Sequence, residues 1–154
     1  MNLYGWIVLF HVASASAFVM TMIIMQLIVA NVMKRIPDCP GKKDGIHFIQ
    51  HRWHPVVDTI IVVVGITGLG LTILNFQMIV GIPLLILKII IGVIALTSAY
   101  CNHFYFRRKK RKLTISGEHP EKLKEINTIM SILDKVALIG GALAAFMGWH
   151  INHV

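Results

Sequence analysis

Long apolar runs alternate with short charged segments along the chain. The runs cover residues 4–32, 55–75, 83–106 and 131–153. A membrane-spanning helix needs about 20 mostly apolar residues, and each run is long enough. Helical periodicity extends the second and fourth runs toward their charged ends. The pattern therefore predicts an all-α integral membrane protein, a single transmembrane domain over 1–154, with helices at 4–32, 45–75, 83–106 and 120–153.

The breaks between these runs predict how the helices are connected. The second and third runs are separated only by a short turn at 75–83, which makes them antiparallel neighbours. Pro37, Pro40 and Gly41 predict an irregular first loop, and Ser116-Gly117 predicts a second break. Pro120 suits the first position of the last helix. The simplest arrangement is an up-down four-helix bundle.

Composition and charge agree with a membrane protein and predict its orientation. The chain is 56% hydrophobic and 14% charged, against about 25% charged residues in a soluble domain. Lysine and arginine concentrate in cytoplasmic loops, and thirteen of the fifteen here lie within 34–52 and 107–124. Both termini are therefore expected outside the cytoplasm, in an inner (cytoplasmic) membrane protein. A basic rim facing anionic headgroups explains the net charge of +8 without nucleic acid.

Two ionisable residues are predicted to lie at a similar depth near the outer surface. His11 follows the start of the first run by seven residues, and Lys88 follows Pro83 by five. At 1.5 Å per residue His11 lies about 10 Å inward and Lys88 about 8 Å inward. A lysine there is expected to be neutral, to extend toward the headgroups or to bind a ligand. A neutral amine and an imidazole can complete the axial ligation of a haem iron. The alternative is that Lys88 reaches outward and His11 bonds a neighbouring helix.

A richer polar layer is predicted at the cytoplasmic side. On a continuous helix, His47, His51, His54 and Asp58 would form one stripe. His103 ends the third run, and Asp134 is expected at the same depth. Such a cluster can ligate a second haem, bind a metal, hold propionates or relay protons; the alternative is solvation at the interface. His150, near the outer end of the last helix, and His47 are secondary candidates.

The chain resembles the HemJ-type protoporphyrinogen oxidases and the wider copper-resistance-D-like membrane proteins. The matching segments are 6–11 (WIVLFH), 84–88 (LLILK) and 99–109 (AYCNHFYFRRK). The resemblance implies b-type haem binding by His11 and Lys88. After His11 the chain has no arginine before Arg35, whereas that family carries an arginine-containing segment there. The resemblance therefore implies haem binding more directly than porphyrinogen oxidation.

The leading hypothesis is a b-type haem protein, a cytochrome b, that transfers electrons within the membrane. One or two non-covalent haems are expected, with His11 and Lys88 at the outer site and His54 or His51 with His103 at the inner site. The expected partners are the lipid bilayer and a redox partner or the quinone pool, in a homodimer or a larger membrane complex. The alternatives are a HemJ-like protoporphyrinogen IX oxidase, a copper or other metal transporter, and a small subunit of a respiratory complex.

Overall fold

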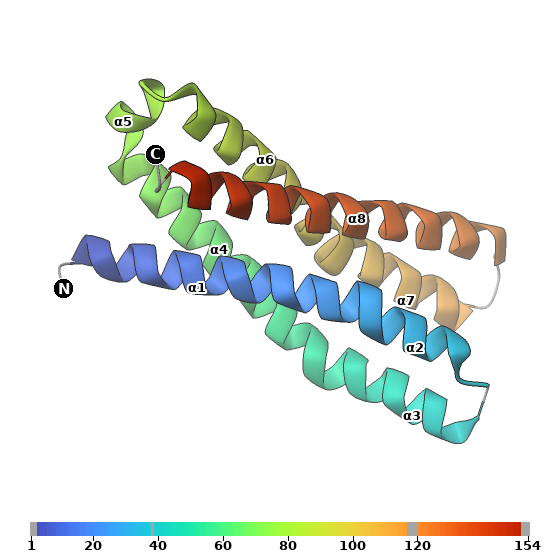
Figure 1. Cartoon of the computed structure of the whole chain (residues 1–154). Coiled ribbons are helices and arrows are strands. Elements are labelled where there is room, and N and C mark those ends of the chain that lie inside the picture. The colour runs from blue at the N-terminus through green and yellow to red at the C-terminus, as the bar shows by residue number, and fades with distance from the viewer. Residues whose placement is uncertain (1–2, 38, 117–119, 152–154) are drawn as a thin grey trace. The chain divides into compact units, whose positions relative to one another are not determined.

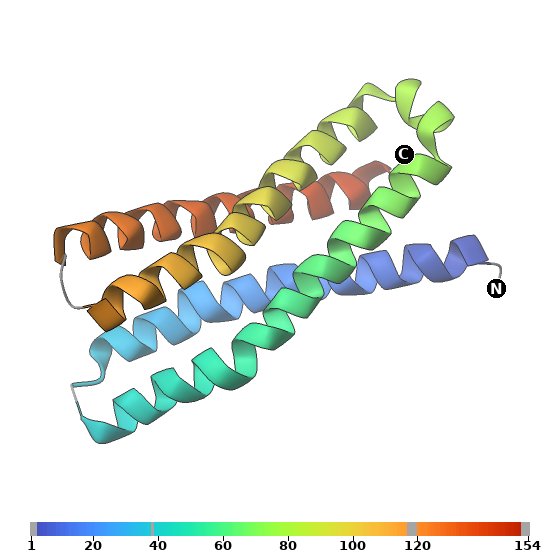
Figure 2. The ribbon, with the colours of Figure 1, turned by 180° about the vertical axis from the view of Figure 1, so that it is seen from behind.

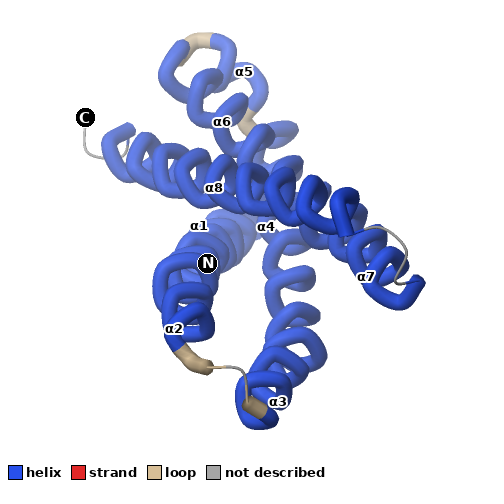
Figure 3. The backbone as a smooth tube through the Cα atoms, turned by 90° about the vertical axis from the view of Figure 1, so that its right-hand side faces the viewer, coloured by secondary structure: helices blue, strands red, loops and turns tan. Residues whose placement is uncertain are grey.

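In the computed structural model, the described residues, which are 3–37, 39–116 and 120–151, form helices and short connections (Figure 3). Four helices are long and apolar enough to cross a membrane: Leu3–Gln26, His51–Leu74, Pro83–Thr114 and Pro120–Gly148. This confirms the all-α class and the four membrane-length helices. Four such helices describe a multi-pass protein associated with a lipid bilayer. The chain divides into two compact units, Met1–Phe76 and Gln77–Val154, and each contains two of these helices.

The first unit is a helical hairpin whose two arms are each interrupted by a π-helical segment. Its elements are α1 (Leu3–Ile23), the π-helical η1 (Ile24–Val29), α2 (Ala30–Arg35), α3 (Pro40–Phe48), the π-helical η2 (Ile49–Trp53) and α4 (His54–Leu74). The second arm begins at Pro40 rather than near residue 45, because Pro40 occupies the first helical position. Pro55 likewise lies in the first turn of α4, directly after η2.

Helices α1 and α4 pack against each other in an antiparallel pair (Figure 1). The Tyr4 hydroxyl donates to Asn75 Oδ1 at 3.3 Å near one end of the pair. Two turns further along α1, His11 contacts Thr67 on α4. Beyond that level the buried apolar side chains are Phe18, Met22, Val57 and Ile61, and Thr21 is a buried polar residue among them. Burial of these side chains is the main source of apolar contact between the two helices.

The second unit is a hairpin that packs through small residues. Its elements are α5 (Phe76–Val80), α6 (Pro83–Tyr100), the π-helical η3 (Cys101–Phe106), α7 (Arg107–Ser116) and α8 (Pro120–Ile151). Helix α6 packs against α8 (Figure 2). The buried apolar residues of the contact are Ala95, Ala99, Ile126 and Ala137. A Cβ on Gly140 would lie 3.0 Å from the Ala95 Cβ. Close approach through small residues is typical of helices in membranes.

Each long helix presents an apolar stripe on its outer side. On α4 the exposed residues Val62, Ile66, Leu69 and Ile73 follow the helical repeat. On α8 the exposed residues Ile132, Val136, Ile139, Leu143 and Phe146 do the same. In water such stripes would be unfavourable, whereas hydrocarbon accommodates them. The stripes therefore agree with a bilayer around these helices.

Two parts of the third arm differ from the prediction. The helix continues beyond residue 106 through α7 to Ser116, because the basic run of α7 has no breaker before Gly117. The turn expected at 75–83 contains a short helix, α5. The last arm begins at Pro120, as predicted, and its helix is described to Ile151.

Candidate functional site

His11 is held by two small residues of α4. Its Nδ1 lies 3.0 Å from the Thr67 Oγ1. A Cβ on Gly68 would lie 3.1 Å from the His11 Cε1, so the imidazole lies directly on the glycine backbone. An alanine at position 68 would therefore require the ring to move by a few tenths of an ångström.

The hydrogen bonds of Thr67 favour one tautomer of His11. The Thr67 hydroxyl donates to the Val63 carbonyl at 2.7 Å. A hydroxyl has a single proton, so Oγ1 must accept from His11 Nδ1–H. The lone pair of the neutral imidazole is therefore on Nε2. Histidines that ligate metals are commonly oriented in this way, through a hydrogen bond made by the other ring nitrogen.

Lys88 belongs to α6 in the second unit, and its side chain lies against α8 at Gly148. A Cβ on Gly148 would lie 2.7 Å from the Lys88 Nζ and 3.1 Å from its Cε. The side chain is half-buried, and among the described residues no acidic side chain forms an ion pair with it. The absence of a side chain at Gly148 thus creates the space that the amine occupies.

His103 is bonded in the opposite sense to His11. It lies in η3 and is 8% exposed. The Arg107 Nη2 lies 3.0 Å from its Nδ1 and 3.4 Å from its Nε2. A guanidinium can only donate, so the nearer nitrogen, Nδ1, must accept with its lone pair. A neutral His103 then carries its proton on Nε2. In this arrangement neither nitrogen presents a lone pair to a metal, although ligation by His103 stays a prediction.

Asn102, in η3, is linked to α8 through a part-buried hydrogen bond. It is 2% exposed, and its Nδ2 donates to Asp134 Oδ1. The same nitrogen lies 3.4 Å from the Met130 carbonyl. The Asp134 carboxylate is also close enough to Arg107 for an electrostatic interaction. Asn102, His103, Arg107 and Asp134 therefore form one polar cluster, which we call the Asp134 cluster.

The expected histidine stripe before the second span is not a regular α-helical face. The π-helical segment η2 ends at Trp53, between His51 and His54. A π-helix has more residues per turn than an α-helix, so the faces before and after it are not in register. His51 is exposed, whereas His54 and Asp58 are half-buried. The prediction of one stripe over these residues is therefore wrong, because it assumed an uninterrupted α-helix.

Several candidates lie outside the described side chains or are separated between the units. His47 and His150 belong to helices, but their side chains are not among the described ones, and His153 lies outside the described residues. His11 and His54 belong to the first unit, and Lys88 and His103 to the second. The two axial pairs therefore stay predictions. Among the described residues, no group of three His, Cys, Asp or Glu side chains could hold a metal ion.

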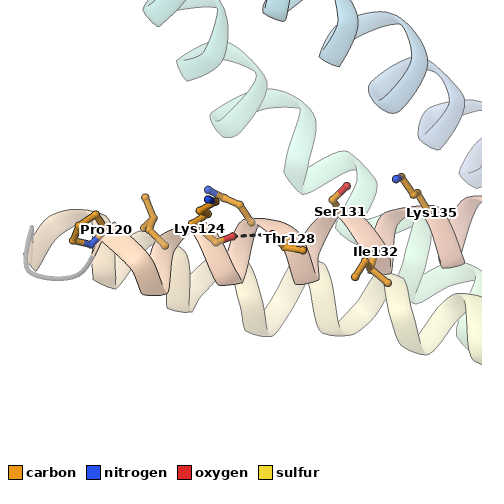
Figure 4. A pocket seen from close by; sticks show the side chains of 8 residues that line it. Pro120, Lys124, Thr128, Ser131, Ile132 and Lys135 are labelled. Atoms are coloured by element: carbon orange, nitrogen blue, oxygen red, sulfur yellow. Dashed lines mark hydrogen bonds between the residues drawn. The ribbon is translucent and has the colours of Figure 1, made fainter.

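The N-terminal half of α8 also carries an exposed polar stripe (Figure 4). Ser131 and Lys135 project from one side of the helix, and Ile132 projects from another. A shallow pocket follows this stripe, lined by Pro120, Leu123, Lys124, Asn127, Thr128, Ser131, Ile132 and Lys135. None of the candidate ligands lines it. The stripe is one face of a single helix and is separate from the Asp134 cluster.

Sequence patterns alone missed the residues that hold the candidates in place. Thr67, Gly68 and Gly148 become visible only through the pairing of helices. Asn102 could have been found, because an amide in an apolar run requires a partner.

No family model, no curated protein and no solved structure matches the chain.

Proposed function

We propose that this chain is a b-type haem membrane protein that transfers electrons within the membrane, with His11 as an axial ligand. The hydrogen bond between His11 Nδ1 and Thr67 Oγ1 carries the proposal. It favours the tautomer that has its lone pair on Nε2, which is the form that an iron ligand requires. Close contact with Gly68 restricts the ring further.

Lys88 is the second axial ligand that we propose, in keeping with the family resemblance. Its amine lies in the space at Gly148, within a membrane-length helix where a lysine is costly unless it has a role. The bound haem would supply one-electron transfer, and its potential would depend on the ligands and on the surrounding dielectric. The side chains would bind and orient it, while apolar helices exclude water.

The orientation and the partners follow from charge. We propose that both termini face outward from an inner membrane, with the basic segments in the cytoplasm. Quinol is the proposed electron donor, because it resides in the same bilayer. The second haem, between His54 or His51 and His103, has less support, because the lone pair of His103 faces Arg107.

The first experiment is a dithionite-reduced minus oxidised spectrum of the protein purified in mild detergent from haem-replete cells. A b-type alpha band is expected, and a pyridine haemochrome assay gives the number of haems per chain. Absence of the band would contradict the proposal.

A matched pair of threonine variants tests the observation that carries the proposal. Thr67→Val removes the acceptor of the His11 Nδ1–H bond and should lower haem affinity by about 10–100-fold. Thr72→Val is the control, because Thr72 lies on the same helix and its hydroxyl donates to the Gly68 carbonyl rather than accepting from His11. Equal haem affinity in the two variants would show that the Thr67 bond has no part in binding.

A further inference from the structure

The hydrogen-bonded pair of Asn102, which is buried, and Asp134, which is half-buried, has no part in the proposed haem site. Asn102 Nδ2 is fully used, because it donates to Asp134 Oδ1 and lies near the Met130 carbonyl. Asn102 Oδ1 is buried and has no hydrogen-bond partner among the described residues. Leaving a buried acceptor unpaired costs about 1–3 kcal/mol. The carboxamide is therefore satisfied on its nitrogen side and unsatisfied on its oxygen side.

A carboxamide can exchange these two sides by half a turn about its last side-chain bond. With Asp134 ionised, both carboxylate oxygens only accept, so the carboxamide must present Nδ2. With Asp134 protonated, its O–H becomes a donor, and the carboxamide can present Oδ1 instead. After this half turn Oδ1 accepts from Asp134, while Nδ2 moves away from Asp134 and the Met130 carbonyl.

We propose that Asp134 is a proton-binding site and that Asn102 is the residue that adapts to its two protonation states. One proton from the aqueous phase at the α7 end of the hairpin binds the carboxylate, and no other bond forms or breaks. The net charge of the pair changes from −1 to zero. Ionisable groups inside membrane helices commonly serve as such sites. The proposal goes beyond haem binding and does not depend on it.

The charged surroundings of Asp134 in this hairpin are few. From α7, Arg107 interacts electrostatically with the carboxylate, and from η3, His103 accepts from Arg107. On α8 itself, Lys135 is exposed and projects from the polar stripe (Figure 4). On α6 the basic residue is Lys88, 14 positions before Asn102, or roughly 20 Å along the helix axis. Arg107 therefore balances the ionised acid and, when Asp134 is protonated, remains paired with His103.

The π-helical segment η3 makes this arrangement possible. Asn102 and His103 are neighbours in sequence, and both are buried. A π-helical turn widens the helix and is frequent at functional sites. It places the carboxamide toward α8 while the following imidazole meets Arg107 in the next turn.

The test is an infrared difference spectrum of the full chain in lipid nanodiscs, recorded between about pH 5 and about pH 8. The carbonyl stretch of a protonated carboxylic acid is expected at the lower pH. Asp134→Asn should remove it, and Asp58→Asn, which changes a half-buried acid of the first unit, should leave the Asp134 contribution intact. Retention of the whole band in Asp134→Asn would overturn the proposal.

A second variant keeps the test decisive if Asp134→Asn does not fold. Asn102→Leu preserves the acid and removes the carboxamide. The carboxylic acid band should move to higher wavenumber, because the acid loses its hydrogen bond to Oδ1, and the amide contribution to the spectrum should vanish. An unchanged band position would overturn the role of Asn102. Neither result depends on a haem spectrum, so the proton-binding proposal can be contradicted without contradicting haem binding, and the reverse.

Discussion

The two helical hairpins give His11, which is half-buried, and His103, which is buried, opposite hydrogen-bonding roles. In the α1–α4 pair, His11 donates from Nδ1 to a threonine hydroxyl that has already used its own proton. In the α6–α8 hairpin, His103 accepts from the Arg107 guanidinium. The first arrangement leaves the lone pair on Nε2, and the second directs it at a cation. Depth and residue type alone would rank the two histidines equally, whereas their partners separate them.

The packing around these histidines differs as well. The α1–α4 core consists of large side chains, among them Phe18, Met22 and Ile61. The α6–α8 core consists mainly of alanines, and Gly140 lies directly on Ala95. Helices that meet through glycine and alanine bring their backbones close together, whereas large side chains hold the α1 and α4 backbones further apart. The first pair therefore suits a ligand-binding residue, and the second suits a fixed polar cluster.

The largest effect is expected from removing each histidine in turn. His11→Ala should abolish haem at the proposed site, because it removes the iron ligand. His103→Ala should retain this haem, because the lone pair of His103 faces Arg107. Pyridine haemochrome per purified chain measures both variants, and a monodisperse elution profile controls for folding. Loss of haem in His103→Ala together with retention in His11→Ala would show that His103, and not His11, is the ligand.

The packing contrast is tested by two glycines of the second hairpin. Gly140→Ala places a Cβ 3.0 Å from the Ala95 Cβ and 3.5 Å from the Ile91 carbonyl, so it should destabilise the protein by about 1–3 kcal/mol. Gly92→Ala meets only the Ala144 Cβ at 4.0 Å, which is ordinary contact. It should be neutral or slightly stabilising. Thermal unfolding in one detergent compares the two, and equal midpoints would mean that the pair adjusts freely.

Gly148 offers a milder test, on the position of Lys88. The atom nearest to a Cβ at 148 is Nζ, at the end of a flexible side chain, so Gly148→Ala should displace the amine at little cost in stability. Labelling of Lys88 by an amine-reactive reagent, measured by mass spectrometry, should increase in this variant. Lys135, which is exposed already, provides the internal control. Unchanged labelling of Lys88 would show that Gly148 does not determine where the amine lies.

The sequence predicted the helices well because each prediction needed only local information. Apolar length predicts a span, and Pro120 begins α8 because a proline is favourable at the first helical position. The basic residues predict orientation by the same local logic. The π-helical segments were not predictable in this way. They depend on backbone hydrogen bonds between residues i and i+5, and no residue pattern in η2 or η3 predicts these bonds.

For the candidate site, the sequence predicted which residues matter but not what each residue does. His11, Lys88, His103 and Asp134 could be singled out because ionisable residues stand out in apolar runs. Their roles could not, because a role depends on the partner across the helix pair. Thr67 becomes the partner of His11 only through the register of α1 against α4. Arg107 becomes the partner of His103 only through the helical turn that follows η3. Gly68 and Gly70 look alike in sequence, yet only Gly68 contacts His11.

That pair of glycines supplies the smallest expected effect. Replacing glycine by alanine within a helix gains about 1 kcal/mol in helix propensity, and at Gly70 nothing lies within 4 Å of the new Cβ, so Gly70→Ala should stabilise the protein by up to this amount. At Gly68 the new Cβ would lie 3.1 Å from His11 Cε1, so the ring must move by a few tenths of an ångström and the gain should be offset.

Both variants are compared by thermal unfolding and by the position of the alpha band. The difference in stability should stay below about 1 kcal/mol, so the spectrum is the sharper measurement. Only Gly68→Ala should shift the band, because only this change moves the ring that Thr67 orients. If the two variants give the same band and the same midpoint, the contact with Gly68 does not restrain His11, and the contrast between the two histidines would then depend on their hydrogen bonds alone.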